Sequence, residues 1–194
     1  MHHVVGILLA AGRGRRFDPE GRQDKLLVSL DAGQSVLLQS ALHLRAWVDR
    51  LIIVTRPGRA AMFQASCQGL EAEWVEAQEA DLGMGASLKA GVSASPLPLT
   101  GWLIGLADMP WIHAQTYQQV RQSLETGCDL ARPCHQGRPG HPVGCSSRVA
   151  DAVMSLRAAA GLGQLFQGST LNIQQLDVND PGCTRDIDLP ADLD

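Results

Sequence analysis

The sequence has little that would mark a secreted, membrane-bound or nucleic-acid-binding protein. Its five cysteines are an odd number, none of them form a C-x-x-C pair, and their spacing is not that of a metal finger. We therefore expect reduced thiols in a cytoplasmic protein. No apolar run approaches the roughly 20 residues that span a bilayer. The segment from Met1 to His3 lacks the basic start and the cleavage site of a signal peptide. The net charge of -4 argues against a general nucleic-acid surface.

Motifs of several common enzyme classes are also missing. A P-loop requires Gly, four residues and then Gly-Lys-Ser or Gly-Lys-Thr, and no such run occurs. The dinucleotide pattern G-x-G-x-x-G fails because Phe17 follows Arg16 where the third glycine would belong, which argues against a dehydrogenase. No Ser-His-Asp pattern is evident. The 194 residues, 45% of them hydrophobic and 19% charged, fit one soluble domain over residues 1–194, with no linker or repeat.

What the sequence does contain is a basic, glycine-rich loop directly after its first apolar run. Val4 to Leu9 predicts a buried strand, and the residues GRGRRF follow soon after it. Gly12 and Gly14 permit a tight turn that brings backbone N–H groups close to a phosphate, and the arginines add charge. Lys25, beyond a polar turn, would add a point charge. The plainer alternative is a glycine turn with solvated arginines and an exposed lysine.

Strand and helix patterns alternate along the chain. Four segments predict helices: residues 35–48, a second helix ending near 67, 113–124 and 148–156. Buried or alternating apolar residues predict strands at 51–54, 73–76, 101–106, 129–133 and 171–178. This order is typical of an α/β domain with a mainly parallel sheet covered by helices.

Two more polar motifs follow predicted strands. In residues 81–89 we expect Gly83 and Gly85 to bring the backbone close to a nucleoside, with Ser87 as a hydrogen-bond donor at the start of a helix. Asp108 follows the strand at 101–106, where one carboxylate can hold Mg²⁺ with phosphates and waters. Both motifs would share the ligand-binding edge of a parallel sheet with the first loop. The alternatives are turn glycines and a helix-capping aspartate.

The last third of the chain has two weaker candidates. A third glycine-rich stretch, residues 137–144, would place Gly140, His141 and Pro142 against an acceptor substrate, unless it is only a hairpin connection. Near the C-terminus, Asp186 and Asp188 would face one side of a strand and share a metal ion with Asp108. The alternative is a solvated acidic terminus followed by a short helix.

Six segments occur in an order that resembles one known family: LLAAGRGRRF, Lys25, GMGASL, LADMPW, GHPV and DIDLPADL. The chain resembles the molybdenum cofactor cytidylyltransferases within the wider MobA-like nucleotidyltransferases, from Val4 to Leu193. The resemblance implies a single three-layer α/β/α Rossmann-like nucleotidyltransferase domain with a mainly parallel mixed sheet. It also implies Mg²⁺-dependent transfer of CMP from CTP to molybdopterin, with release of pyrophosphate, and as further partners a client molybdoenzyme or its chaperone.

The resemblance also implies roles for residues that match the family motifs. Arg16 and Lys25 would stabilise the phosphates, Asp108 would bind the metal with Asp186 or Asp188, and the acceptor would contact Gly140, His141 and Pro142. The nucleotide would contact Leu9, Ala10, Ala11, Gly12, Gly14, Arg16, Lys25, Gly83, Gly85 and Ser87.

The match to the family is incomplete in two places. The loop between Phe17 and Lys25 is longer than in many members, and residues 160–163 lack the aspartate of a Gly-Asp-x-Gly stretch on the acceptor side. Ala11 favours the cytidylyl branch, because guanylyl relatives more often carry a second glycine there. Three alternatives stay open: GTP-dependent guanylylation of molybdopterin, nucleotidyl transfer to a sugar or polyol phosphate, and a non-catalytic nucleotide-binding module.

Overall fold

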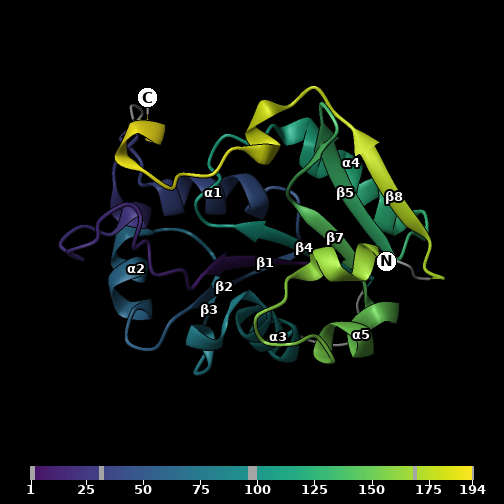
Figure 1. The fold of residues 1–194 in the computed structure, drawn as a ribbon, viewed down its shortest axis with the longest axis horizontal. Helices are drawn as coiled ribbons and strands as arrows, with labels where there is room; N and C mark the ends of the chain where they lie inside the picture. Colours follow the sequence, from purple (N-terminus) through teal and green to yellow (C-terminus); the bar gives the residue numbers. More distant parts are fainter. Residues whose placement is uncertain (1–2, 31–32, 96–99, 168–169, 194) are drawn as a thin grey trace.

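The computed structural model describes residues 3–30, 33–95, 100–167 and 170–193. Over these residues one mixed sheet has the strand order β3-β2-β1-β4-β7-β5-β6, and β8 pairs with β5 (Figure 1). The first four strands in this order run parallel, whereas β7 is antiparallel to β4 and β5. The strands are β1 (Val4–Ala10), β2 (Arg50–Thr55), β3 (Glu73–Glu76), β4 (Gly101–Leu106), β5 (Leu130–His135), β6 (Arg138–Pro139), β7 (Val143–Ser146) and β8 (Ile173–Asp177).

Helices cover both faces of this sheet, as Figure 1 shows. Apolar side chains of α1, α2 and α4 pack on one face, and those of α3 and α5 pack on the other. The predicted three-layer α/β fold with a mainly parallel mixed sheet is therefore confirmed. No helix among the described residues is long and apolar enough to cross a bilayer. The helices are α1 (Val36–Arg45), α2 (Ala60–Ser66), α3 (Met84–Ala94), α4 (Ala114–Glu125) and α5 (Ala150–Met154).

The central strand β1 explains why the first apolar run has no polar interruption. Every residue of β1 is buried. Val4 and Leu8 pack with the α1 side, whereas Val5, Ile7 and Leu9 pack with the α3 side. A strand that is buried on both faces needs apolar residues at successive positions rather than in alternation.

Helix α3 begins at Met84, three residues before Ser87, where the sequence suggested its start. The glycines around this start serve packing as well as the turn. A Cβ atom on Gly85 would lie 2.5 Å from the carbonyl oxygen of Arg157 and 2.6 Å from that of Ala160. The missing side chain therefore lets the backbone of residues 157–160 lie directly against the first turn of α3.

The order of the strands creates a crevice beside β1. The chain continues from β1 to β2 and β3 in one direction, and then returns to place β4 on the other side of β1. The loops after β1 and β4 consequently diverge at their carboxyl ends. In open α/β sheets this reversal point is where ligands bind.

The C-terminal segment crosses this edge as an extended strap and not as the expected strand. Figure 1 shows it running from β8 back to the loop after β1. Residues 185–188 have no strand pairing, and a 3₁₀ helix, Pro190–Leu193, follows. Ile187 is fully buried, and its N–H donates to the carbonyl oxygen of Asp108 at 3.0 Å. Because the segment is extended, Asp186 and Asp188 still alternate with a buried residue between them.

Part of the third glycine-rich stretch does form a hairpin. Strands β5 and β6 are antiparallel, and Gln136 and Gly137 connect them with φ angles of 51° and 77°. After the hairpin the chain approaches the C-terminal strap so closely that a Cβ atom on Gly140 would lie 2.2 Å from the carbonyl oxygen of Cys183. Only glycine fits at this position without a shift of the backbone.

Candidate active site

A pocket of about 330 Å³ lies at the crevice beside β1. Its lining comes from three places: the loop after β1, the start of α3 and the end of β4. It brings together six residues that the sequence analysis assigned to the nucleotide or its metal, and adds five others. The lining residues are Leu9, Ala11, Gly12, Arg13, Ala80, Asp81, Gly83, Met84, Ser87, Leu106 and Asp108.

The four glycines assigned to the nucleotide have different surroundings. Gly12 lines the pocket, and a Cβ atom on it would have no neighbour within 4 Å. Gly14 has a φ of 60°, and its backbone lies against the side chain of Lys25. Gly83 lines the pocket with a φ of 130°. Gly85 is not part of the lining and faces the backbone of residues 157–160 instead.

Lys25 is the centre of a charged cluster beside the pocket. Its side chain is 10% exposed, and its Nζ lies 2.6 Å from Oδ2 of Asp108. The same Nζ donates to the carbonyl oxygen of Ile187 at 2.6 Å and lies 3.6 Å from Oδ1 of Asp188. Arg16 reaches the same cluster, with 2.5 Å between its guanidinium and Oδ2 of Asp188. The structure therefore brings Arg16, Lys25, Asp108 and Asp188 to one place.

Local structure around Lys25 explains how it reaches this cluster despite the long loop before it. The carboxylate of Asp24 caps a 3₁₀ turn, Lys25–Leu27, by accepting from the N–H of Leu26 at 3.0 Å, and pairs with Arg59 of the loop before α2. Within the loop, the carboxylate of Asp18 accepts from two backbone N–H groups. These hydrogen bonds hold the long loop in a defined turn and keep Lys25 at the crevice.

Asp186 lies near the cluster but forms none of these ion pairs. Its pKa is raised, first by partial burial and then by the negative charges of Asp188 and Asp108, while Lys25 acts in the opposite direction. Of the two aspartates that the sequence left equal, Asp188 is the one whose carboxylate contacts both cations.

The oxygen atoms around Lys25 suit a divalent metal ion. Asp108 and Asp188 supply carboxylates, and Ile187 supplies a carbonyl oxygen, all around one ammonium group. Within the described residues no group of three His, Cys, Asp or Glu side chains could hold a metal by itself. Mg²⁺ does not require such a group, because it usually takes one or two carboxylates and completes its octahedron with water and substrate phosphates. The donor set fits Mg²⁺ in that manner.

An ion pair forms part of the lining of this first pocket. Arg13 donates two hydrogen bonds to the carboxylate of Asp81, and both side chains are about half exposed. The pKa of Asp81 is lowered by this pair and by the more distant charges of Arg56 and Arg15. Arg15 and Arg56 thus add positive charge near this edge of the pocket, which would favour an anionic ligand.

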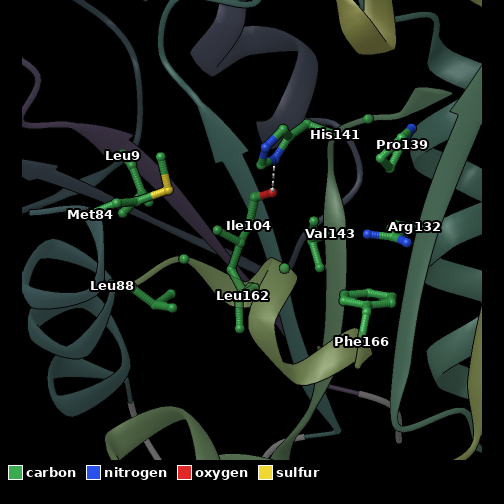
Figure 2. A pocket seen from close by; sticks show the side chains of 13 residues that line it. Leu9, Met84, Leu88, Ile104, Arg132, Pro139, His141, Val143, Leu162 and Phe166 are labelled. Atoms are coloured by element: carbon green, nitrogen blue, oxygen red, sulfur yellow. Dashed lines mark hydrogen bonds between the residues drawn. The ribbon is translucent and has the colours of Figure 1, made fainter. Parts of the chain in front are cut away.

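A second pocket of about 190 Å³ adjoins the first and shares Leu9 and Met84 with it. Figure 2 shows Leu9 and Met84 on one side of this second pocket and Arg132 and Phe166 on the other. Two of the residues assigned to the acceptor line it, and the third, Pro142, is buried beside them. The lining consists of Leu9, Met84, Leu88, Ile104, Arg132, Pro139, Gly140, His141, Val143, Gly161, Leu162, Gly163 and Phe166.

His141 is a neutral side chain in this second pocket. Burial lowers its pKa, while the carbonyl of Ile104 and the charge of Asp108 act in the opposite direction. Its Nδ1 lies 3.5 Å from the carbonyl oxygen of Ile104 (Figure 2). Because a carbonyl oxygen only accepts hydrogen bonds, we assign the proton to Nδ1, which leaves Nε2 as an acceptor.

Sequence reasoning missed several lining residues of both pockets. Met84 lies between Gly83 and Gly85 in one of the motifs, but only the glycines and Ser87 were assigned a role there, and Phe166 lies outside every motif. Arg132 did carry a signal, because it places a charge inside a short strand whose neighbours, Leu130 and Ala131, are fully buried. Charged residues at such positions are usually paired or functional.

The fold and this site together define a class. An α/β sheet with a glycine-lined pocket at its strand reversal, beside two cations and two carboxylates, is suited to bind a nucleoside triphosphate and a metal ion. A model of the MobA-like NTP transferase domain matches residues 6–177. The chain therefore belongs to the MobA-like nucleotidyltransferase family, as its motifs predicted. A search of curated proteins found no match.

Solved structures share this fold over nearly their whole length. Rv0371c of Mycobacterium tuberculosis, in complex with manganese, is 23% identical over 98% of this chain and 95% of that chain, with a TM-score of 0.76. Molybdopterin-guanine dinucleotide biosynthesis protein A of Archaeoglobus fulgidus is 19% identical over 97% and 94%, with a TM-score of 0.71. The 4-diphosphocytidyl-2C-methyl-D-erythritol synthase of Anaerococcus prevotii is 12% identical over 99% and 95%, with a TM-score of 0.78. At these identities the likeness shows the fold alone.

Proposed function

We propose that this protein transfers CMP from CTP to molybdopterin and releases pyrophosphate, with Mg²⁺ as its metal ion. The observation that carries the proposal is the convergence of Arg16, Lys25, Asp108 and Asp188 beside a glycine-lined pocket that shares lining residues with a second pocket. One pocket would hold the nucleotide and the other the acceptor. Because they share Leu9 and Met84, the two substrates would meet there.

The proposed reaction requires no covalent bond between a protein side chain and a substrate. An oxygen of the acceptor phosphate forms a bond to the α-phosphorus of CTP, and the bond from that phosphorus to the pyrophosphate oxygen breaks. Both reactants are anions, so neutralising and aligning them dominates the barrier. Lys25 and Arg16 would stabilise the charge on the phosphates and on the leaving pyrophosphate.

The metal ion would be held by Asp108 and Asp188. When bound, Mg²⁺ would supply positive charge to the phosphate oxygens. The oxygen donors around Lys25 support this assignment. The manganese complex of Rv0371c adds support for a divalent ion in a protein of the same fold.

The choice of CTP rests on the size of the base site. Ala11 lines the nucleotide pocket, and its methyl group takes space that a second glycine would leave open. Cytosine has one ring and guanine has two, so the smaller base suits the narrower site.

The choice of molybdopterin rests on the chemistry of the second pocket. Leu88, Ile104, Val143, Leu162 and Phe166 give it mostly apolar walls. A sugar or polyol would place several hydroxyl groups against these walls, where Arg132 and His141 could pair with only some of them, at about 1–3 kcal/mol for each hydroxyl left unpaired. The flat ring system of a pterin tolerates such walls better.

The five cysteines, all free and buried, also fit a reducing cytoplasmic location.

A pyrophosphate-release assay with molybdopterin, Mg²⁺ and each of CTP, GTP, ATP and UTP tests the proposal, with mass detection of the dinucleotide. We expect CTP to be the preferred donor. Asp108→Asn should reduce kcat by at least about 100-fold, because it removes a carboxylate from the phosphate site. Asp151→Asn, on the exposed surface of α5, is the matched control and should retain full activity.

Each of three other results would change a different part of the proposal: the nucleotide, the acceptor or the activity itself. Preference for GTP would make the protein a guanylyltransferase. Turnover with a polyol phosphate but not with molybdopterin would replace the acceptor. Nucleotide binding without pyrophosphate release from any acceptor would indicate a non-catalytic binding module.

A further inference from the structure

The far wall of the second pocket carries a cation to which neither the motifs nor the proposed mechanism gives a role. Arg132 lies in β5 and lines the pocket together with Phe166. Its guanidinium carbon lies 4.2 Å from the centroid of the Phe166 ring, and Figure 2 shows the group stacked on that ring. A planar cation on an aromatic face is held in one orientation, so it is well prepared to bind a ligand.

Most of the hydrogen-bonding capacity of this guanidinium is unused. One terminal nitrogen donates to Oε1 of Gln175 at 3.1 Å. The Nε atom of Arg132 is buried and has no hydrogen-bond partner within the described part of the chain. A guanidinium has five N–H donors, and leaving a buried donor unsatisfied is unfavourable. Because Nε is closed off from the pocket, the donors that a ligand oxygen would reach are the N–H groups of the two terminal nitrogens, and the described residues engage one of these nitrogens, through Gln175.

The rest of the lining restricts what that ligand can be. Among the described residues that line the pocket, none has a carboxylate, and His141 is neutral with Nδ1 directed at a carbonyl oxygen. A cationic group in the pocket would therefore meet Arg132 with no compensating negative charge. The walls favour a flat, conjugated molecule whose outer edge accepts hydrogen bonds.

We propose that Arg132, stacked on Phe166, is an acceptor-binding residue that donates hydrogen bonds to a carbonyl or anionic oxygen at the outer end of the acceptor. This end lies away from the nucleotide, because Leu9 and Met84, which border the nucleotide pocket, are on the opposite side (Figure 2). The inference rests on the proposed function in assigning this pocket to the acceptor. The ring carbonyl of a pterin has the required chemistry, whereas the ammonium group of an amino-alcohol phosphate does not.

Steady-state kinetics of Arg132→Gln test this role. With CTP saturating, the KM for molybdopterin should rise about 10- to 100-fold, which is the range for a lost hydrogen bond to a charged group. The KM for CTP should stay within about twofold of the wild-type value, because Arg132 does not line the nucleotide pocket. Phe166→Leu keeps the cation but removes the ring beneath it. It should raise the KM for molybdopterin about 3- to 10-fold, and it serves as the second variant if Arg132→Gln does not fold.

Arg138→Gln is the matched control. Arg138 lies on β6, is exposed and does not line the pocket, so this variant should leave both KM values unchanged. A second measurement does not require turnover: binding of free pterin, followed by its fluorescence anisotropy without nucleotide. The Kd for pterin should rise in Arg132→Gln by a factor similar to that of the KM and should not change in Arg138→Gln.

The two measurements distinguish failure of this inference from failure of the proposed function. If wild-type protein turns over molybdopterin and Arg132→Gln has an unchanged KM for it, the inference is overturned and the function stands. If no acceptor is turned over but pterin binds and is weakened by Arg132→Gln, the function fails and the inference stands. If wild-type protein neither turns over molybdopterin nor binds pterin, both are overturned.

Discussion

Removing the ammonium group of Lys25 is the most direct perturbation of the charged cluster. In Lys25→Met the side chain keeps a similar length, but Asp108 and Asp188 lose the cation between them. The charges of Asp108 and Asp188 already raise the pKa of Asp186, and the variant would lose the opposing effect of Lys25. The variant should therefore be less stable than wild type even though its core is intact.

The magnitude follows from the contacts of Nζ. Lys25 makes hydrogen bonds of 2.6 Å to Asp108 and to the carbonyl of Ile187. Removing one partner of a buried pair costs about 3–5 kcal/mol. The side chains of Asp108 and Asp188 are 21% and 25% exposed, so water can compensate in part, and we expect a loss of about 3 kcal/mol. For a domain of this size that corresponds to a fall in Tm of about 6–12 °C.

Thermal unfolding with and without millimolar Mg²⁺ is the assay. Mg²⁺ binding to the folded state alone raises stability, and it should raise the Tm of Lys25→Met more than that of wild type, because Lys25 no longer competes for the carboxylates. Lys89→Met is the control, since Lys89 lies on α3 and has no ion pair in the described part of the chain. A Tm of Lys25→Met equal to that of Lys89→Met, with the same response to Mg²⁺, would refute the reasoning.

Two further predictions concern the glycines and the histidine of the second pocket. Gly85→Ala should lower the free energy of unfolding by about 1–3 kcal/mol, because its Cβ would overlap the carbonyl oxygens of Arg157 and Ala160. A Cβ on Gly12 would have open space, so Gly12→Ala should not change stability, but its methyl group in the proposed nucleotide pocket should raise the KM for CTP. Denaturant unfolding measures the effect on stability, and pyrophosphate release measures the effect on KM. Equal stability of the two variants would contradict the packing argument. His141 has a lowered pKa in the folded state, so the unfolded state binds its proton first and stability falls as pH drops below about 6.5. His141→Asn should remove up to about 1 kcal/mol of the stability difference between pH 7 and pH 5.5, and a pH dependence identical to that of wild type would show that His141 takes no part in it.

The architecture was largely predictable because it follows from local patterns. The unbroken apolar run at Val4–Leu9 requires a strand covered on both faces, and the alternation of strands with helices requires a mainly parallel sheet. The helix predicted from residue 35 is capped by Ser35 itself, whose hydroxyl accepts from the N–H of Leu38 at 3.2 Å. These outcomes depend on neighbours along the chain, which a sequence displays directly.

The strand predicted near the C-terminus is absent, and Gly85 lies outside the lining of the first pocket, for the same physical reason. Alternating residues at 186–188 describe an extended backbone, but a strand also needs a partner, and this segment packs on the loop of Asp108 instead. Gly85 looked like a residue for ligand approach, yet its neighbour is the backbone of residues 157–160. Local pattern does not specify which distant segment lies opposite a residue.

The candidate site likewise has some features that the sequence predicts and others that only the folded structure determines. The sequence by itself determined which residues are candidates for the chemistry: glycines that would allow close backbone approach, Arg16 and Lys25 as proposed phosphate ligands, and Asp108 at the end of a central strand. Tertiary structure alone decided that Asp188 rather than Asp186 contacts these cations, and that Arg132 stands on Phe166 in the second pocket. Those contacts join residues from distant parts of the chain, and their geometry depends on how the strap and the sheet pack together.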